Sequence, residues 1–302
     1  MKKDAKRFSV IIPVYRSERT LERCIEGLKR QTFEDFSVIF VDSSPDDRSV
    51  RMIQADAGFQ IIRPGKRMWM HAARNLGARQ AVGEILVFTD PDCVPAPDWL
   101  SELDGSFTDG EDVVGGPVAC YPGGYVDGAA HIVKYWMWLP NGESSYVSDL
   151  PSANLAILKD TFEMAGGFGE KHFSSDTLFC TQLRERGLRL FFNSRAVVEH
   201  IHETRASSLL VERYLRGRDF CSMRSAMRSW NRLKSVLLLL GFWILPLRQV
   251  FWKLRVCVQR GFLPTFVRSL PLVVVSDYAW MLGQASSSFR HLVGGNLSSL
   301  SD

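Results

Sequence analysis

Two aspartates separated by one residue follow an apolar run in the first third of the chain. Asp90 and Asp92 come directly after Ile85-Leu86-Val87-Phe88-Thr89, which carries no charge. Such a run predicts a buried strand, and ligands of open α/β sheets bind beyond the carboxyl ends of strands. Two carboxylates at that edge suit a hard divalent cation, Mg²⁺ or Mn²⁺, which would neutralise a diphosphate. The alternative is an acidic turn, because Asp and Pro are common turn residues.

Strands and helices are predicted to alternate before these aspartates. Apolar runs predict strands at residues 8–14, 36–41 and 59–63. Helices are predicted from an N-cap at Ser17, at about 49–57 and at about 70–82, the first with an apolar stripe of Leu21, Ile25 and Leu28. This alternation implies parallel strands with right-handed crossovers. No P-loop or dinucleotide fingerprint follows the first strand, so the phosphates of a ligand must be bound in another way. The divalent cation at Asp90 and Asp92 is the candidate.

Composition limits the classes of protein to consider. The 302 residues are 46% hydrophobic and 23% charged, which is typical of a globular protein. A net charge of +4 is too small to indicate a nucleic-acid partner, and none is expected. The six cysteines have no zinc-like spacing, so we expect reduced thiols in a cytosolic setting. The charged N-terminus passes directly into a strand, which is not the pattern of a signal peptide.

Four short motifs follow one another in the first third of the chain: VIIPVY (10–15), FVDSSPD (40–46), ARNLGA (73–78) with AVGE (81–84), and FTDPDC (88–93). In this order they resemble family 2 glycosyltransferases, and the resemblance covers residues 8–100. It implies an α/β GT-A fold, with a mostly parallel sheet and helices on both faces. It also implies inverting, metal-dependent transfer from a nucleotide-diphosphate sugar.

The resemblance further implies where a UDP-type nucleotide would bind. The nucleotide would lie along Pro13, Tyr15 and Asp42, with Asp42 facing the base. Arg74 and Asp90 would help to position it. The alternatives are a solvated loop acid for Asp42 and, for Arg74, a helix-surface charge paired with a nearby acid.

Two later segments continue the resemblance: PSANLAI (151–157) and AGGFGE (165–170). In the family, the second segment leads to a helix with a Glu-Asp pair that faces the acceptor. Here the matching residues are Ser175 and Asp176. We expect Asp176 to take the proton of an acceptor hydroxyl, the alternative being an ordinary N-cap. Gly167, Phe168 and Ser175 are expected on the acceptor side, and the change from Glu to Ser175 bears on the acceptor class.

Two histidines, His200 and His202, end a strand predicted at 196–201. Alternate residues of a strand point to the same face. The family often has a metal-ligating histidine near here, so His200 is expected to join Asp90 and Asp92 as a ligand, with His202 as second choice. The alternative is a histidine of the core.

The sequence predicts two regions: a GT-A domain at 1–205, with its nucleotide half at 8–100 and acceptor half at 110–205, and a helical region at 206–302. Residues 120–150 are expected to be irregular and on the acceptor side, and the tail from Ser286 to be frayed. The helical region starts with eight Lys or Arg against two acids between residues 205 and 234. Its apolar runs, 236–247 and 263–285, are too short or too interrupted for a clean membrane span.

Aromatic and basic residues of this region predict association with the cytoplasmic leaflet of a membrane. The expected interfacial anchors are Trp243, Trp252 and Trp280 with Arg248, Lys253 and Arg255. The alternative is a soluble helical subdomain or a dimer interface. A membrane location would suit a lipid-linked acceptor, although a saccharide is equally open.

Three candidate functions differ in the features that the sequence must contain. The first is a glycosyltransferase of cell-surface polysaccharide or glycolipid synthesis, located at the inner face of the cell membrane. The second is a non-catalytic, nucleotide-sugar-binding GT-A subunit of a membrane assembly, for which the loss of the Glu before Asp176 is the only motive. A nucleotidyltransferase would require a glycine-rich phosphate loop with a lysine, which the sequence lacks.

Overall fold

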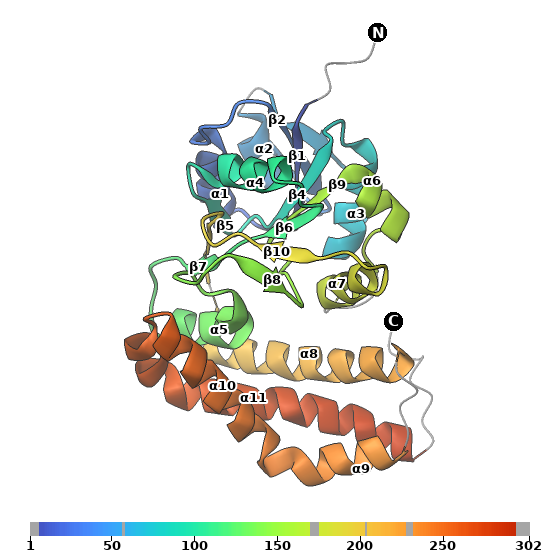
Figure 1. Cartoon of the computed structure of the whole chain (residues 1–302), viewed down its shortest axis with the longest axis vertical. Coiled ribbons are helices and arrows are strands. Elements are labelled where there is room, and N and C mark those ends of the chain that lie inside the picture. The colour runs from blue at the N-terminus through green and yellow to red at the C-terminus, as the bar shows by residue number, and fades with distance from the viewer. Residues whose placement is uncertain (1–5, 56–57, 170–174, 203, 228–231, 294–302) are drawn as a thin grey trace. The chain divides into compact units, whose positions relative to one another are not determined.

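The computed structural model describes residues 6–55, 58–169, 175–202, 204–227 and 232–293. The chain forms two compact units (Figure 1). Of the described residues, the first unit contains those in 6–121, 140–169 and 175–201, and the second contains those in 122–139 and 202–293. The helical second unit therefore takes in a segment from the middle of the sequence.

Eight strands form the main sheet of the first unit, in the order β3-β2-β1-β4-β9-β6-β10-β8 (Figure 1). They are β1 (Phe8–Val14), β2 (Phe36–Asp42), β3 (Gln60–Ile62), β4 (Ile85–Thr89), β6 (Val113–Gly115), β8 (Ser145–Val147), β9 (Asn154–Leu158) and β10 (Leu190–Phe192). The first four strands pair in parallel, which confirms the predicted parallel pairing. Strand β9 runs antiparallel between β4 and β6, so its first residues lie beside the carboxyl end of β4.

Helices cover both faces of this sheet. They are α1 (Leu21–Lys29), α2 (Arg48–Gln54), α3 (Met70–Gln80), α4 (Trp99–Thr108), α6 (Lys159–Ala165) and α7 (Ser175–Glu185). Helix α3 lies so close to β1 that a Cβ on Gly77 would be 2.5 Å from Ile11 Cγ2. On the opposite face, Trp99 of α4 donates a hydrogen bond to Asn154. Helix α1 begins after Thr20 and has no side-chain cap, so the N-cap predicted at Ser17 is wrong.

A small sheet of three strands adjoins the main one. It contains β5 (Cys93–Pro95), β11 (Val198–His200) and β7 (Val118–Cys120), in that order. Residues 113–120 are divided between the two sheets, because Gly116 and Pro117 separate β6 from β7. The buried Asn154 joins the sheets: its Nδ2 donates to Pro117 O at 2.9 Å and to Ala196 O at 2.8 Å.

The second unit is helical. It contains α5 (Tyr125–Tyr135), η1 (Trp136–Trp138), α8 (Ala206–Met227), α9 (Arg232–Leu240), η2 (Gly241–Trp243), α10 (Leu245–Gln259) and α11 (Leu263–Leu292). The prediction that residues 120–150 are irregular is wrong, because α5 and η1 lie there. Fraying from Ser286 is also wrong within the described residues, since α11 continues to Leu292. No single helix of the described residues is long and apolar enough to cross a membrane. The bent pair α9–η2 and α10 has the required length and composition when its two parts are taken together.

Charged side chains lie inside this helical unit. Lys253 of α10 donates to both carboxylate oxygens of Asp277 on α11, at 3.0 and 2.8 Å, and both residues are almost fully buried. Arg213 of α8 lies 3.5 Å from the same carboxylate. The prediction that Lys253 anchors in an interface is therefore wrong, because its ammonium group is held by Asp277. Trp280 is also partly covered, by Phe220 and by the guanidinium of Arg213.

Candidate functional site

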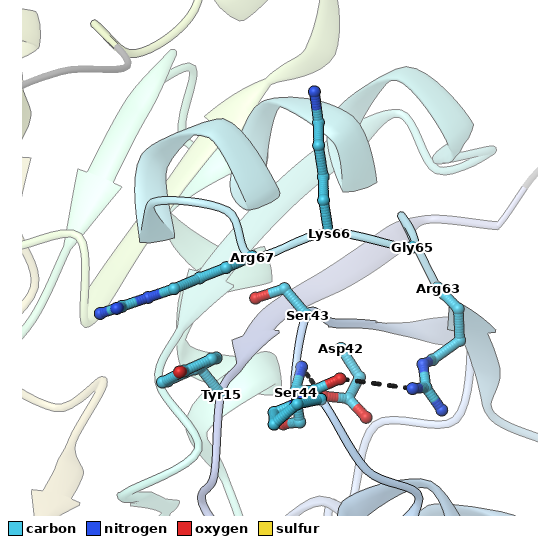
Figure 2. A pocket seen from close by; sticks show the side chains of 9 residues that line it. Tyr15, Asp42, Ser43, Ser44, Arg63, Gly65, Lys66 and Arg67 are labelled. Atoms are coloured by element: carbon cyan, nitrogen blue, oxygen red, sulfur yellow. Dashed lines mark hydrogen bonds between the residues drawn. The ribbon is translucent and has the colours of Figure 1, made fainter. Parts of the chain in front are cut away.

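A cavity of about 260 Å³ opens at the carboxyl ends of β1 and β2 (Figure 2). It is lined by Tyr15, Asp42, Ser43, Ser44, Pro45, Arg63, Gly65, Lys66 and Arg67. The parallel register pairs Val14 with Asp42, which brings both strand ends to one place. Two of the residues expected to hold a nucleotide, Tyr15 and Asp42, therefore share this cavity. Pro13 lies one step back in β1, opposite Val41.

Asp42 is fully buried at the base of this cavity. Its Oδ1 accepts a hydrogen bond from the Ser44 backbone N–H at 2.9 Å. Its Oδ2 is also buried and has no hydrogen-bond partner among the described residues. A buried carboxylate oxygen is costly unless a donor meets it, so this atom marks a place for a ligand N–H or O–H. The interpretation of Asp42 as a solvated loop acid is wrong.

Three basic residues on the loop after β3 surround the same cavity, and the sequence analysis missed them. Arg63 donates to Ser44 O at 3.3 Å and forms an ion pair with Asp47. The Arg67 guanidinium lies 4.6 Å from the centre of the Tyr15 ring. The Lys66 side chain extends away from Asp42 (Figure 2). The signal in the sequence is the basic run in Arg63-Pro-Gly-Lys-Arg67, directly after the predicted strand.

Arg74 and Asp90 form an ion pair at the end of β4. Arg74 is fully buried on α3, and its Nη2 donates to Asp90 Oδ1. Its Nη1 lies 3.2 Å from His71 Nδ1. Arg74 is therefore not a charge on the helix surface. Burial raises the pKa of the Asp90 carboxyl, and the neighbouring Asp92 adds to the rise, whereas Arg74 opposes it.

Asp92 and His200 meet because of strand register. Strand β11 pairs antiparallel with β5, placing His200 opposite Cys93, and Ile201 N–H donates to Asp92 O at 2.8 Å. As a result, His200 Nε2 lies 3.4 Å from Asp92 Oδ2. The second choice, His202, belongs to the helical unit, where its Nε2 lies 3.1 Å from His131 Nδ1.

The donor set around Asp92 fits a divalent cation. Ligand atoms of Asp92, Cys93 and His200 lie within 4.8 Å of one another. Carboxylate and imidazole together suit Mn²⁺, or Mg²⁺ with more oxygen ligands. The Cys93 thiol is a poor ligand here, because burial raises its pKa far above the usual value and keeps it protonated.

Asp176 is the second residue of α7 and faces the loop before β9. Its Oδ2 accepts from Ser152 Oγ at 3.3 Å, and its Oδ1 accepts from Thr177 N–H at 2.9 Å. The Thr89 hydroxyl donates to Ala153 O at 2.9 Å. Because Thr89 precedes Asp90 and Ala153 follows Ser152, the candidate base and the candidate metal ligands lie at the same edge of the sheet.

A second carboxyl, Asp149, accompanies Asp176 and was missed in the sequence. Thr177 Oγ1 donates to its Oδ2 at 2.9 Å. Burial raises the pKa of Asp149 to about 7, and the negative charge of Asp176 contributes to the rise. Nothing in the sequence marks Asp149, because its partner is brought to it by tertiary structure. The pair gives this edge a group that titrates near neutral pH.

The residues expected on the acceptor side lie mostly in the core. The Phe168 ring is 4.7 Å from the Phe179 ring, centroid to centroid, and its backbone is held by Asn75. Gly167 has φ +73°, which favours glycine, and a Cβ there would be 2.8 Å from Asn75 Oδ1. Ser175 is fully buried. Their acceptor role stays a prediction, while their packing explains their residue types. Glu170, the end of that motif, lies outside the described residues.

Residues 9–158 match the family model "Glycosyl transferase family 2". The chain belongs to glycosyltransferase family 2. Among its relatives is the glycosyltransferase AglE of Haloferax volcanii, 34% identical over 38% of this chain and 41% of AglE. A pre-mycofactocin glycosyltransferase of Mycobacterium tuberculosis is 26% identical over 69% of this chain and 46% of its own length.

This family 2 chain has the GT-A fold, as solved structures show. A mannosyltransferase from Pyrobaculum calidifontis, in complex with GDP-Man and Mn²⁺, superposes with a TM-score of 0.61 at 20% identity, covering 94% of this chain and 87% of that one. A third relative is an undecaprenyl-phosphate 4-deoxy-4-formamido-L-arabinose transferase of Proteus mirabilis, 30% identical over 36% of each chain. The chain spans less than half the length of these curated relatives.

Proposed function

We propose that this protein is an inverting glycosyltransferase that moves a sugar from a nucleotide-diphosphate sugar to an acceptor hydroxyl. The observation that carries the proposal is the unpartnered, buried Oδ2 of Asp42, in a cavity on the same sheet edge as Asp90 and Asp176. A ring N–H of uracil would satisfy that oxygen, and a UDP-type donor is favoured. Guanine also has such a donor, and GDP-Man is the ligand named for the Pyrobaculum structure.

Asp90, Asp92 and His200 would hold the divalent metal. When bound, such a cation offsets the charge that develops on a leaving diphosphate. The residues of the chain do the rest: Arg74 orients Asp90, and the register of β11 keeps His200 against Asp92. The nearby basic side chain of Arg67, stacked on Tyr15, would favour an anionic ligand in the cavity.

Asp176 would act as the base. Its carboxylate takes the proton from the acceptor hydroxyl, whose oxygen forms a bond to the anomeric carbon. The bond from that carbon to the diphosphate oxygen breaks, and the electron pair leaves with the nucleotide. Ser152 and Thr177 fix the carboxylate by hydrogen bonds, which keeps one oxygen directed for this role.

For the acceptor we propose a lipid-linked saccharide, handled at the inner face of the cell membrane. The Proteus relative is named as a transferase acting with undecaprenyl phosphate. In this chain, a basic helical region follows the transferase domain. Synthesis of a cell-surface polysaccharide or glycolipid is the process that fits such an acceptor.

Calorimetric titration tests the donor half of this proposal. UDP, GDP and dTDP would be titrated with and without Mn²⁺ into the wild type, Asp92→Ala and the exposed control Asp109→Ala. We expect metal-dependent binding of one nucleotide, lost in Asp92→Ala and kept in the control. If no nucleotide binds under either condition, the proposal is wrong and the resemblance describes the fold alone.

A further inference from the structure

The outer surface of the helical unit carries a continuous apolar stripe. Along α9, η2 and α10 the side chains at 233, 237, 240, 244, 247, 251 and 258 are all exposed and all apolar. Leu240 is 72% and Ile244 is 69% exposed. The first six are spaced four and three residues apart in turn, and position 258 comes seven residues after 251, which keeps them on one side of each helix. A contiguous apolar surface of this size marks an interaction site.

The interior of the same unit contains charged and small polar side chains beside its apolar core. Lys253, Asp277 and Arg213 lie inside, together with four serines of α11 that are almost fully buried: Ser269, Ser276, Ser287 and Ser288. Helices α8 and α11 approach so closely that a Cβ on Gly217 would be 2.0 Å from Trp280 O. Apolar outside, paired charges inside and small residues between helices are features of helices surrounded by lipid.

The charges beside the stripe are all positive. Arg232, Lys234, Arg248 and Arg255 are exposed, and the sequence has no Asp or Glu from residue 220 to residue 276. Pairing this face with a second copy of itself would bring like charges together. Anionic lipid headgroups would instead meet cations, while the acyl chains meet the stripe.

We infer that the bent pair α9–η2–α10 is a membrane-docking face, which inserts the stripe 233–258 into the headgroup and upper acyl region of an anionic bilayer. The two helices meet at 66°, so the pair has the form of a shallow wedge. The inference gives the proposed membrane location a structural basis. It rests on that part of the proposed function and not on the transfer chemistry.

Vesicle co-sedimentation of the full chain tests this inference. The vesicles would be phosphatidylcholine alone or with phosphatidylglycerol, at low and high salt. We expect strong binding to the anionic vesicles, and a loss of at least about tenfold in the double variant Leu240→Glu/Ile244→Glu. The control is Val82→Glu/Met164→Glu, which changes two exposed apolar residues of the first unit and should bind as the wild type does.

A second double variant measures the electrostatic contribution to vesicle binding. Arg248→Glu/Arg255→Glu should lower binding to anionic vesicles and weaken its salt dependence, while binding to neutral vesicles changes little. The depth of insertion can be measured on Trp243, which is exposed on η2. Lipids brominated near the headgroup should quench tryptophan fluorescence more than lipids brominated at the chain end, and Trp243→Phe should reduce that difference.

Several outcomes would overturn the inference. They are the absence of vesicle binding by the wild type, unchanged binding by the Leu240→Glu/Ile244→Glu variant, and a wild-type dimer that binds no vesicles but dissociates in that variant. The dimer would identify a second copy as the occupant. Nucleotide titration of the same samples keeps the two proposals apart: nucleotide binding without vesicle binding removes only the docking face, and the reverse removes only the donor site.

Discussion

The two units of this protein differ in where their buried charged groups lie and in how fully those groups are paired. In the first unit the sheet is packed with apolar residues, and the charged groups collect where β1, β2 and β4 end. In the second unit a lysine, an aspartate and an arginine lie inside, and apolar residues face outward. Buried charge at the sheet edge includes an oxygen without a partner, Asp42 Oδ2, whereas Asp277 accepts bonds with both oxygens. A buried charged group that lacks a partner indicates a ligand site. A buried charged group whose partners all lie within the protein indicates a structural role.

The largest expected effect concerns the first unit. Asp176→Asn should lower transfer to a hydroxyl acceptor by roughly 10²–10⁴-fold, because the base is lost, while nucleotide affinity stays the same. A phosphate acceptor needs no deprotonation, so the same variant should then retain most of its activity. Initial rates with both acceptor types would decide between them. Unchanged transfer to every acceptor would remove Asp176 from catalysis, and an inactive wild type that still binds nucleotide would indicate a non-catalytic subunit.

The next effect concerns the second unit. Asp277→Ala should destabilise it by about 3–5 kcal/mol, because Lys253 is left buried without its partner. Thermal unfolding followed by circular dichroism, in the presence of the same vesicles, would measure the change. The matched control replaces Arg213, Lys253 and Asp277 together with Met, Met and Leu, which should be close to neutral. If the single variant is as stable as the triple one, the buried charges are not what holds these helices.

A smaller effect returns to the nucleotide cavity. Asp42→Asn keeps an acceptor for the Ser44 N–H but presents an amide N–H₂ where the unpartnered oxygen was. Nucleotide affinity should fall about 10–100-fold, which corresponds to about 1.4–2.7 kcal/mol. The variant should still bind the nucleoside diphosphate more tightly than the nucleoside, because only the contact to the base is lost. Equal affinities for wild type and variant would show that the base lies elsewhere.

The last effect is a pH dependence of stability. The pKa of Asp149 is raised from 3.8 to about 7, so the folded state binds this proton more tightly than the unfolded state. The free energy of unfolding should therefore fall as pH rises from about 4 to about 7, by at most about 1.4 kcal/mol for each pH unit, and then level off. Asp149→Asn should remove this contribution. Urea denaturation at several pH values would show it, and identical slopes in both proteins would contradict it.

The first half of the fold was predictable because its signals are local. The strands at 8–14, 36–42 and 85–89 are uninterrupted apolar runs, and α3 was predicted to within two residues. What failed depends on distant partners. Residues 125–135 contain glycine and aromatics without a clear helical stripe, yet they form α5 within the helical unit.

The residues of the candidate site were likewise predictable only where their signals are local. Asp42 and Asp90 are marked by the strands that they end, but their partners are not marked. Asp149 has no local signal, and the burial of Lys253 follows only from the position of Asp277, 24 residues further along the chain. Average hydropathy also hides the exposed apolar stripe and the buried charges of the second unit, because it cannot tell inward from outward positions.

Asn154 has a consequence for motion. One buried amide holds Trp99 on its oxygen side and two backbone carbonyls on its nitrogen side, joining the sheet that ends in Asp90 to the sheet that carries His200. A movement of one sheet relative to the other would have to break these hydrogen bonds. We therefore expect donor entry and nucleotide release to depend on the loops around the cavity rather than on a movement between the sheets.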